Sequence, residues 1–359
     1  MLKNKIYISG LNMTGKSFLS SLLNGNPSIA CYPFHKFGLS LEYNKFKNYL
    51  VERTTRHIFN KKFFESSEKK TIKVKLYNEK KIYKINISEL ALFIIKNNGS
   101  IPLLFEAHYS KKYPIFSGDT NYEFRNIDFN FNTFINSIEK NIDLYQQEVF
   151  ELEDLDNIIF NSFLNSTDQY ESNLQQYKYY CQCTSNSLNE INFLLDNYKN
   201  SKLIYIKRDL VSSSYSVAKR LIAKNNGLIS KNNIKKFIFN YAESRKINED
   251  IYLNSIKNYS LKSNLLIINF NDLFSRRKDI MYNICDFLNI KFKESMMIPH
   301  ELSTKINNSD FHQKNMSDDP NELFSEKELN EIKNILNSKT KLFFYKYLYR
   351  VLLKINLIK

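Results

Sequence analysis

Tryptophan is absent from the 359 residues, whereas lysine, asparagine, isoleucine, tyrosine and phenylalanine are abundant throughout. This indicates a compositional bias that extends along the whole chain. Cysteine is scarce too, and the four present are Cys31, Cys181, Cys183 and Cys285. None belongs to a C-x-x-C pair or stands at zinc-ligand spacing from a histidine, so the pattern argues against a metal site and predicts reduced thiols in a reducing compartment.

Long apolar runs are also missing. No stretch reaches the roughly 18 apolar residues of a membrane-spanning helix, and too few apolar residues precede Gly10 for the core of a secretory signal. No internal repeat and no Pro- or Gly-rich linker divides the chain. We therefore expect a soluble cytoplasmic protein with one domain over residues 1–338. Residues 339–359 predict a basic amphipathic helix that either packs on the body or lies against the inner face of an acidic membrane.

The charge is unbalanced, with 52 Lys and Arg against 37 Asp and Glu and a formal net charge of +15. Such an excess favours anionic partners such as nucleotides, sulfated or phosphorylated glycans, nucleic acid or acidic lipid. The compositional bias explains the same excess equally well. The basic residues form no recognisable nucleic-acid-binding module, so we expect no nucleic-acid partner.

The segment at residues 8–27 reads ISGLNMTGKSFLSSLLNGNP. Residues 10–17 fit the phosphate-loop pattern G-x-x-x-x-G-K-[ST]. The apolar run at residues 3–9 predicts a strand before the loop, and the helical spacing over residues 16–24 predicts a helix after it. Backbone N–H groups at such a turn, together with the positive end of the helix dipole, bind phosphate. The pattern does not identify the phosphorylated ligand.

Two further apolar segments, residues 202–209 and 264–272, are each followed by a helical pattern. This is typical of parallel strands that are buried on both faces. The sequence therefore predicts an α/β fold with a parallel β-sheet flanked by helices. A helical and hairpin insertion is expected at about 45–195.

Within that insertion, residues 71–77 and 81–87 alternate polar and apolar side chains across a short turn and predict a β-hairpin. Ser88 is expected to cap the helix that follows. Residues 130–200 have helical periodicity and contain no clear strand, so we expect helices there.

A second anion site is indicated where the predicted strand at 202–209 ends. Arg208 stands at that end and Ser216 lies two turns into the next helix, so a guanidinium and a hydroxyl suit a phosphate monoester there. Asp209 is expected to hold the loop of Arg208. Asp209 and Asp272 also stand where a kinase carries its magnesium ligand, which keeps a kinase open as an alternative.

These motifs together resemble the sulfotransferase family, whose donor is 3′-phosphoadenosine 5′-phosphosulfate. The family's first loop typically reads G-x-P-R-S-G-T-T-x-L, and GLNMTGKSFL is similar to it. The family's Arg-Asp with a serine eight positions later matches Arg208, Asp209 and Ser216. NFNDLFSRRKDIMYNICDFLNIKF at 269–292 is similar to a Y-E-D-L segment with its following helix. IPHELSTKINNSDF resembles a later P-T-x-G-x-W-x-G-N-S-x-F motif.

The resemblance implies the phosphate-loop sulfotransferase fold and a set of donor-binding residues. They are Asn12, Met13, Thr14, Gly15, Lys16, Ser17 and Phe18 in the loop, and Arg208 and Ser216 at the 3′-phosphate. Arg220 is a further candidate at that phosphate. Asn307, Asn308 and Ser309 stand where the family has a loop close to the nucleotide.

The match departs from the family pattern at the first loop, since Met13 replaces the family's Arg or Lys. A cation there stabilises charge on the leaving phosphate, and we expect Lys16 to supply it. The resemblance places His35 where carbohydrate- and tyrosine-modifying members carry their general base. Glu106 and His108, at the end of an apolar run, are the competing candidates.

The leading hypothesis is a metal-independent sulfotransferase that converts the donor to adenosine 3′,5′-bisphosphate and sulfates a hydroxyl of a carbohydrate or glycolipid. The Gly-Lys-Ser sequence at residues 15–17 favours an alternative, a small-metabolite kinase that uses Mg·ATP. The loss of a cation at Met13 favours a third, a relative that binds the nucleotide without catalysis.

Overall fold

A computed structural model of the chain describes the helices and strands that flank the predicted phosphate loop and Arg208. The described residues are 4–10, 14–35, 39, 43–52, 70–97, 131–166, 177–184, 194, 201–224, 230–260, 264–301, 304–305, 319–338, 344 and 347. Among them no helix is long and apolar enough to cross a membrane. The predicted C-terminal helix lies outside the described residues except for Phe344 and Tyr347, which are helical and exposed.

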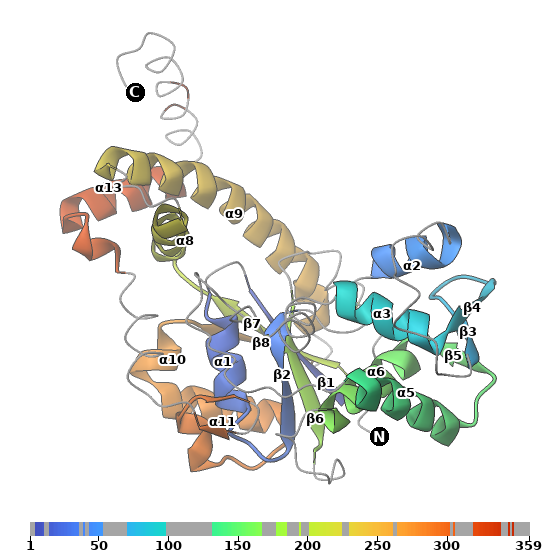
Figure 1. Cartoon of the computed structure of the whole chain (residues 1–359). Coiled ribbons are helices and arrows are strands. Elements are labelled where there is room, and N and C mark those ends of the chain that lie inside the picture. The colour runs from blue at the N-terminus through green and yellow to red at the C-terminus, as the bar shows by residue number, and fades with distance from the viewer. Residues whose placement is uncertain are drawn as a thin grey trace.

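The centre of the fold is a five-stranded sheet in the order β2-β6-β1-β7-β8, and all of its neighbouring strands are parallel (Figure 1). Its strands are β1 (Asn4–Ser9), β2 (Ile29–His35), β6 (Tyr179–Cys183), β7 (Ser201–Lys207) and β8 (Leu265–Asn269). The predicted strands at 3–9, 202–209 and 264–272 are confirmed as β1, β7 and β8. The α/β class with a parallel sheet is confirmed as well.

The expectation that residues 130–200 contain no strand is wrong. β6 lies inside the sheet between β2 and β1, and all five of its residues are buried. Its sequence YYCQC is short and mixes tyrosines with a glutamine, so it lacks the apolar run of a typical buried strand. β2 has no strand signal either, because Pro33 interrupts it. The sheet accommodates this segment through a register shift between Cys31 and His35.

Burial on both faces is confirmed for β7 but wrong for β8. β8 forms the edge of the sheet, and the side chain of Ile267 is 44% exposed. An edge strand has a neighbour on one side only, so an apolar segment does not by itself guarantee full burial.

The predicted hairpin is confirmed. β3 (Thr71–Lys75) and β4 (Ile82–Asn86) pair antiparallel, and β5 (Val149–Glu151) adds to β3 in parallel. The following helix, α3 (Ile87–Asn97), begins before the predicted cap at Ser88. The side chain of Asn86 accepts a hydrogen bond from the backbone N–H of Ser88 at 2.8 Å, so Asn86 takes the capping role.

The helices form three groups. Those near the first phosphate loop are α1 (Lys16–Leu23), α10 (Asp272–Ser275) and α11 (Arg277–Leu288), with the 3₁₀ turn η4 (Glu294–Met297) and the short strands β9 (His300–Glu301) and β10 (Thr304–Lys305). The second group is α2 (Tyr43–Glu52), α3, α5 (Phe131–Tyr145) and α6 (Leu152–Asn165). The third is α8 (Leu210–Lys224), α9 (Lys231–Ser260) and α13 (Glu326–Asn337), with the 3₁₀ turn η5 (Pro320–Glu322).

Each group buries its own apolar cluster. Helices α1 and α11 cover one face of the sheet, where Ile6, Ile8 and Ile204 point. Helix α6 covers Tyr32 and Tyr180 on the other face, and α8, α9 and α13 pack on one another beyond the sheet. The two faces of the sheet are therefore covered by different helices, as in other α/β folds.

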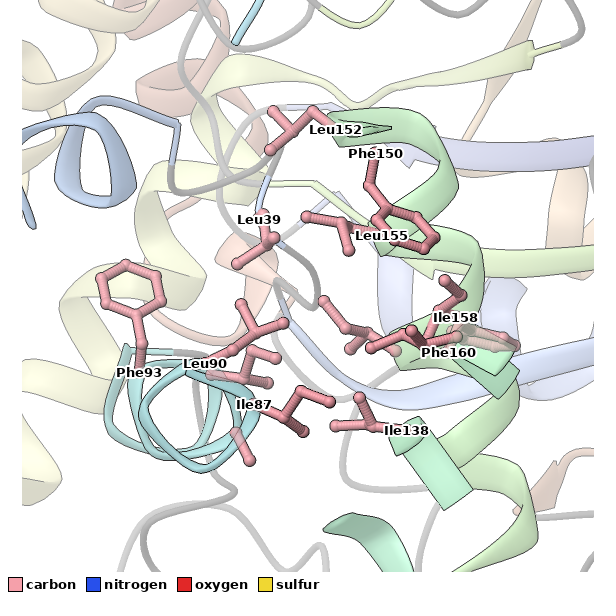
Figure 2. Packing of buried hydrophobic residues seen from close by; sticks show 14 of the residues in the cluster. Leu39, Ile87, Leu90, Phe93, Ile138, Phe150, Leu152, Leu155, Ile158 and Phe160 are labelled. Carbon is pink, nitrogen blue, oxygen red and sulfur yellow. The ribbon is translucent and has the colours of Figure 1, made fainter. Parts of the chain in front are cut away.

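In the second cluster Leu39 lies between α3 and α6, near Leu90 and Leu155 (Figure 2). Its backbone N–H also donates to Oδ1 of Asp156, which is buried on α6. The chain that leaves β2 is therefore attached to α6 four residues after His35.

Candidate functional site

The order of the strands identifies a crevice at one edge of the sheet. β1 leads through α1 to β2 on one side, whereas β7 lies directly against β1 on the other side. In open parallel sheets, ligands bind outside the carboxyl ends of the strands where the strand order reverses in this way. The phosphate loop follows β1 and Arg208 follows β7, so both predicted anion sites border the same reversal point.

The phosphate loop needs glycine at both glycine positions of its sequence pattern, Gly10 and Gly15. Gly15 has φ +84° and caps the N-terminus of α1, where its carbonyl accepts the N–H of Leu19 at 2.9 Å. Gly10 has φ +150°, and a Cβ there would lie 2.6 Å from the carbonyl oxygen of Ile206. These positive φ values and close approaches exclude side chains. The packing around Gly10 and Gly15 therefore requires glycine at both positions.

The ammonium group of Lys16 is held against the loop. Its Nζ donates to the carbonyl oxygen of Gly10 at 2.9 Å, and the side chain is 7% exposed. Thr14 is buried beside it and Ser17 is half-buried at the start of α1. A cation, two hydroxyls and the positive end of a helix dipole thus gather at one turn, which is the chemistry of an anion site.

Phe270 joins the two predicted anion sites. The guanidinium carbon of Arg208 lies 4.3 Å from the centroid of the Phe270 ring, a cation–π contact. A Cβ on Gly15 would lie 2.4 Å from the same ring, so the ring is packed against the phosphate loop. Phe270 directly follows β8, and its N–H donates to the carbonyl of Lys207 at 2.7 Å. Phe270 is not predicted as a site residue from the sequence, because an aromatic residue directly after a strand is a weak signal.

Asp209 has a structural role at the start of α8. Its Oδ2 accepts hydrogen bonds from both the backbone N–H and the hydroxyl of Ser212 at 2.8 Å, which caps the N-terminus of α8. Ser216 is fully buried in α8, and its hydroxyl donates to the carbonyl of Ser212 at 3.0 Å. A contact between Ser216 and a phosphate therefore stays a prediction.

Phe18 faces the core. Its ring stacks on that of Phe274 with the centroids 4.9 Å apart, and the guanidinium of Arg277 lies 5.3 Å from the Phe18 ring centroid. Only the backbone of Phe18 is therefore available to a nucleotide in the phosphate loop.

Several predicted site residues lie outside the described residues. They are Asn12, Met13, Glu106, His108, Asn307, Asn308 and Ser309. For His35 the structure describes the backbone, which ends β2 with its Cα in register with Cys183. For Arg220 it describes the backbone within α8. The end of β2 lies at the same edge of the sheet as the phosphate loop, because the strands are parallel.

The four cysteines are all buried. Burial raises the pKa of the Cys183 thiol to about 12, although the charge of Lys16 acts in the opposite direction. Burial likewise raises the pKa of Cys285 to about 11. Thiols with such pKa values carry little thiolate at neutral pH, so they are poor nucleophiles.

A cavity of about 540 Å³ opens at the carboxyl ends of β7 and β8, next to Arg208 and Phe270. Helices α9 and α13 close its far side. Its charged lining residues are Lys207, Arg208, Asp209, Glu249, Asp272 and Lys333. The volume is in the range of pockets that hold nucleotide-sized ligands.

Comparison with known proteins gives one family. Residues 123–294, which contain β6, β7, β8 and Arg208, match the model of the sulfotransferase family. No curated protein sequence matches the chain.

Among solved structures, the chain is similar to the sulfotransferase domain of the curacin biosynthetic pathway, with 14% identity, TM-score 0.40, and 85% of this chain and 84% of that one covered. It is similar to the sulfotransferase domain of the Synechococcus PCC 7002 olefin synthase, with 11% identity, TM-score 0.42, and 83% and 78% covered. A sulfotransferase from Alicyclobacillus acidocaldarius gives 11% identity, TM-score 0.37, and 86% and 88% covered.

Proposed function

We propose that the chain, whose residues 123–294 match the sulfotransferase family, transfers the sulfuryl group of 3′-phosphoadenosine 5′-phosphosulfate to a hydroxyl group. The observation that carries the proposal is the contact of Phe270 with both Gly15 and Arg208. One aromatic ring thereby connects a backbone cradle for one phosphate with a guanidinium for another. A nucleotide with phosphates at both its 5′ and 3′ positions matches such a pair of sites.

The residues present fit this donor at the 5′ end. In the proposed complex, the N–H groups of Gly15 to Ser17 and the hydroxyls of Thr14 and Ser17 bind the 5′-phosphosulfate. Lys16 already lies over the loop, where its ammonium would meet the oxygen that bridges phosphorus and sulfur. Arg208 would bind the 3′-phosphate, with Ser216 as the predicted second contact. The donor then lies along the reversal point between β1 and β7.

The proposed reaction is an in-line displacement at sulfur. The acceptor oxygen attacks sulfur, and the bond from sulfur to the 5′-phosphate oxygen breaks with its electron pair staying on that oxygen. Adenosine 3′,5′-bisphosphate leaves, and Lys16 with the loop N–H groups stabilises the charge on it. His35 accepts the hydroxyl proton, a step typically worth about 10² to 10⁴ in rate. Glu106 and His108 are the alternative bases.

We propose a carbohydrate or glycolipid hydroxyl as the acceptor, on the resemblance of the His35 segment to glycan-modifying members of the family. The solved structures named above include sulfotransferase domains from the curacin biosynthetic pathway and from an olefin synthase, so other acceptors are outcomes of the test. A screen of hydroxyl-bearing glycans and lipids with ³⁵S-labelled donor tests this part of the proposal. Transfer to an unrelated hydroxyl compound alone would contradict it.

Calorimetry tests the donor. We expect adenosine 3′,5′-bisphosphate to bind more tightly than ATP, and EDTA to leave its affinity unchanged. Equal affinities, or a preference for Mg·ATP over the bisphosphate, would contradict the donor assignment. The latter result would favour the small-metabolite kinase that the G-K-S spelling at residues 15–17 suggests. Tight binding of the bisphosphate without transfer to any acceptor would instead favour an inactive relative with Met13 in place of a cation.

A further inference from the structure

The cavity beside Arg208 carries two more cations from different parts of the chain. Lys207 is the last residue of β7, and Lys333 comes from α13, far along the sequence. Neither ammonium group has a hydrogen-bond or ion-pair partner among the residues that the structure describes, whereas many other lysines of the chain do. Three cationic side chains therefore line one cavity at the carboxyl edge of the sheet.

The carboxylates of the same cavity are already engaged elsewhere. Asp209 caps α8, as described above. Asp272 accepts from the amide of Asn269 at 3.2 Å and from Arg276 at 3.1 Å, and these hydrogen bonds lower its pKa below the usual value. Glu249 accepts from the hydroxyl of Tyr205 at 3.3 Å. The acidic side chains thus have partners within the protein, and the lysines remain available to an anionic ligand.

Helix α13 holds Lys333 at a defined place. Lys231 of α9 pairs with Glu328 at 2.7 Å, and Nζ of Lys246 donates to the carbonyl of Leu336 at 3.0 Å. Ser325 and Glu328 form a reciprocal capping box at the start of α13. Leu336 is buried and also lines the cavity, and residues three apart on a helix share a face, so Lys333 points to the same side. These contacts fix the backbone of α13 and so the place from which the exposed Lys333 side chain extends.

The cavity has three cations and three carboxylates, and Lys207 and Lys333 are cations without an ion-pair partner among the described residues, so they can pair with a dianionic phosphate. We propose that Lys333 and Lys207 bind the 3′-phosphate of the nucleotide together with Arg208, and that Lys333 makes the site selective for nucleotides that carry this phosphate. The inference rests on the proposed function and deepens it. It assigns to α13, which lies beyond the segment matched to the family, a direct part in donor recognition.

The test compares two nucleotides that differ only in the 3′-phosphate. Calorimetry with adenosine 3′,5′-bisphosphate and with adenosine 5′-monophosphate is performed on the full chain and on Lys333→Ala. We expect Lys333→Ala to weaken the bisphosphate roughly tenfold, the size of one charge-assisted hydrogen bond, and to leave the monophosphate within about twofold. Lys207→Ala should act in the same way. Lys333→Arg should keep most of the selectivity.

Lys327→Ala is the matched control, because Lys327 is an exposed lysine of the same helix and does not line this cavity. It should change neither affinity. If the wild-type chain prefers the bisphosphate and Lys333→Ala keeps that preference in full, the assignment of Lys333 is wrong and the proposed function stands. Equal losses for both nucleotides would also contradict it. If the wild-type chain binds both nucleotides equally well, the proposed function and this inference are both wrong.

Discussion

The guanidinium of Arg208 lies over the ring of Phe270, 4.3 Å from its centroid, and the same ring is packed against Gly15 of the phosphate loop. The residues that follow three neighbouring parallel strands, β1, β7 and β8, thus meet at one edge of the sheet. In the proposed complex this contact would set the distance between the two bound phosphates.

Arg208→Ala is expected to weaken adenosine 3′,5′-bisphosphate by tenfold or more, because a hydrogen bond to a charged group is worth about 1.5 to 3 kcal/mol. Adenosine 5′-phosphosulfate lacks the 3′-phosphate and should lose little. Arg208→Lys should behave more like Ala than like Arg, since an ammonium group cannot form the two parallel hydrogen bonds of a guanidinium. Calorimetry with both ligands measures the difference. Similar losses for both would show that Arg208 does not bind the 3′-phosphate.

Gly15→Ala is expected to weaken nucleotide binding and to lower the free energy of unfolding. The left-handed backbone at Gly15 costs an alanine about 1 to 2 kcal/mol, and the new methyl group would collide with the Phe270 ring. A double-mutant cycle with Phe270→Leu, measured by urea denaturation, separates the backbone cost from the collision with the ring. We expect Phe270→Leu to relieve part of the penalty. Strict additivity of the two changes would mean that the ring and the loop are not in contact.

His35→Gln is expected to lower the turnover number by about 10² to 10⁴ while the affinity for adenosine 3′,5′-bisphosphate stays unchanged, as for the loss of a general base. Glu106→Gln and His108→Gln are the matched controls, because these residues are the competing candidates. The assay is transfer from ³⁵S-labelled donor to the best acceptor found in the glycan and lipid screen. A large loss in either control, with His35→Gln active, would reassign the base.

Asp156→Ala is expected to destabilise the fold by about 3 to 5 kcal/mol, the usual cost of breaking a buried charged contact. The change removes the acceptor of the Leu39 N–H and an opposite charge near the fully buried Lys5. Asp156→Asn should cost less, because its amide oxygen still accepts from Leu39. Asp154→Asn, on the same helix but half-exposed, is the control. Urea denaturation measures all three. Equal costs for the Ala and Asn variants would argue against the Leu39 contact.

Lys5 makes stability depend on pH. Burial lowers the pKa of Lys5 from 10.5 to about 8, although Asp156, Glu153 and Asp154 raise it. Between pH 8 and 10.5 the unfolded chain therefore binds more protons at this residue than the folded one, and its contribution to stability rises with pH. Lys5→Met abolishes that contribution. The unfolding free energy of wild type minus that of Lys5→Met should therefore increase from pH 8 to pH 10.5.

In the unfolded chain, thiols and tyrosines lose protons in the same range. Burial raises their pKa values in the folded protein, so they lower stability as the pH rises above about 9. They are present in both proteins, so the difference between wild type and Lys5→Met removes them. A difference that is constant from pH 7 to 10.5 would contradict the lowered pKa of Lys5.

Local patterns predicted what depends on neighbours in sequence. The phosphate loop, the strands β1, β7 and β8 and the β3–β4 hairpin all follow from spacing within a few residues. β6 could not be predicted in this way, because YYCQC becomes a strand only when β1 and β2 supply hydrogen bonds on both sides. β2 could not be predicted either, because it contains Pro33. The register shift between Cys31 and His35, which allows a proline in this strand, exists only in the assembled sheet.

The site shows the same division. The types of residue at Gly15, Lys16 and Arg208 pointed to anion binding from sequence alone. The contact that brings them together depends on Phe270, which comes from another strand, and the cavity depends on α13. Neither the Phe270 contact nor the cavity produces a periodicity or a motif in the sequence, because each depends on residues that are far apart along the chain.

The place of β6 in the sheet has a consequence for synthesis on the ribosome. β1 is made first, yet both strands that flank it, β6 and β7, are made after residue 178. The nascent chain therefore carries β1 and β2 with unpaired edges until half of the protein has emerged, and open strand edges favour aggregation. Such long-range pairing also slows folding. Production of the intact protein should accordingly benefit from slow translation, low temperature or chaperones that cover exposed strands.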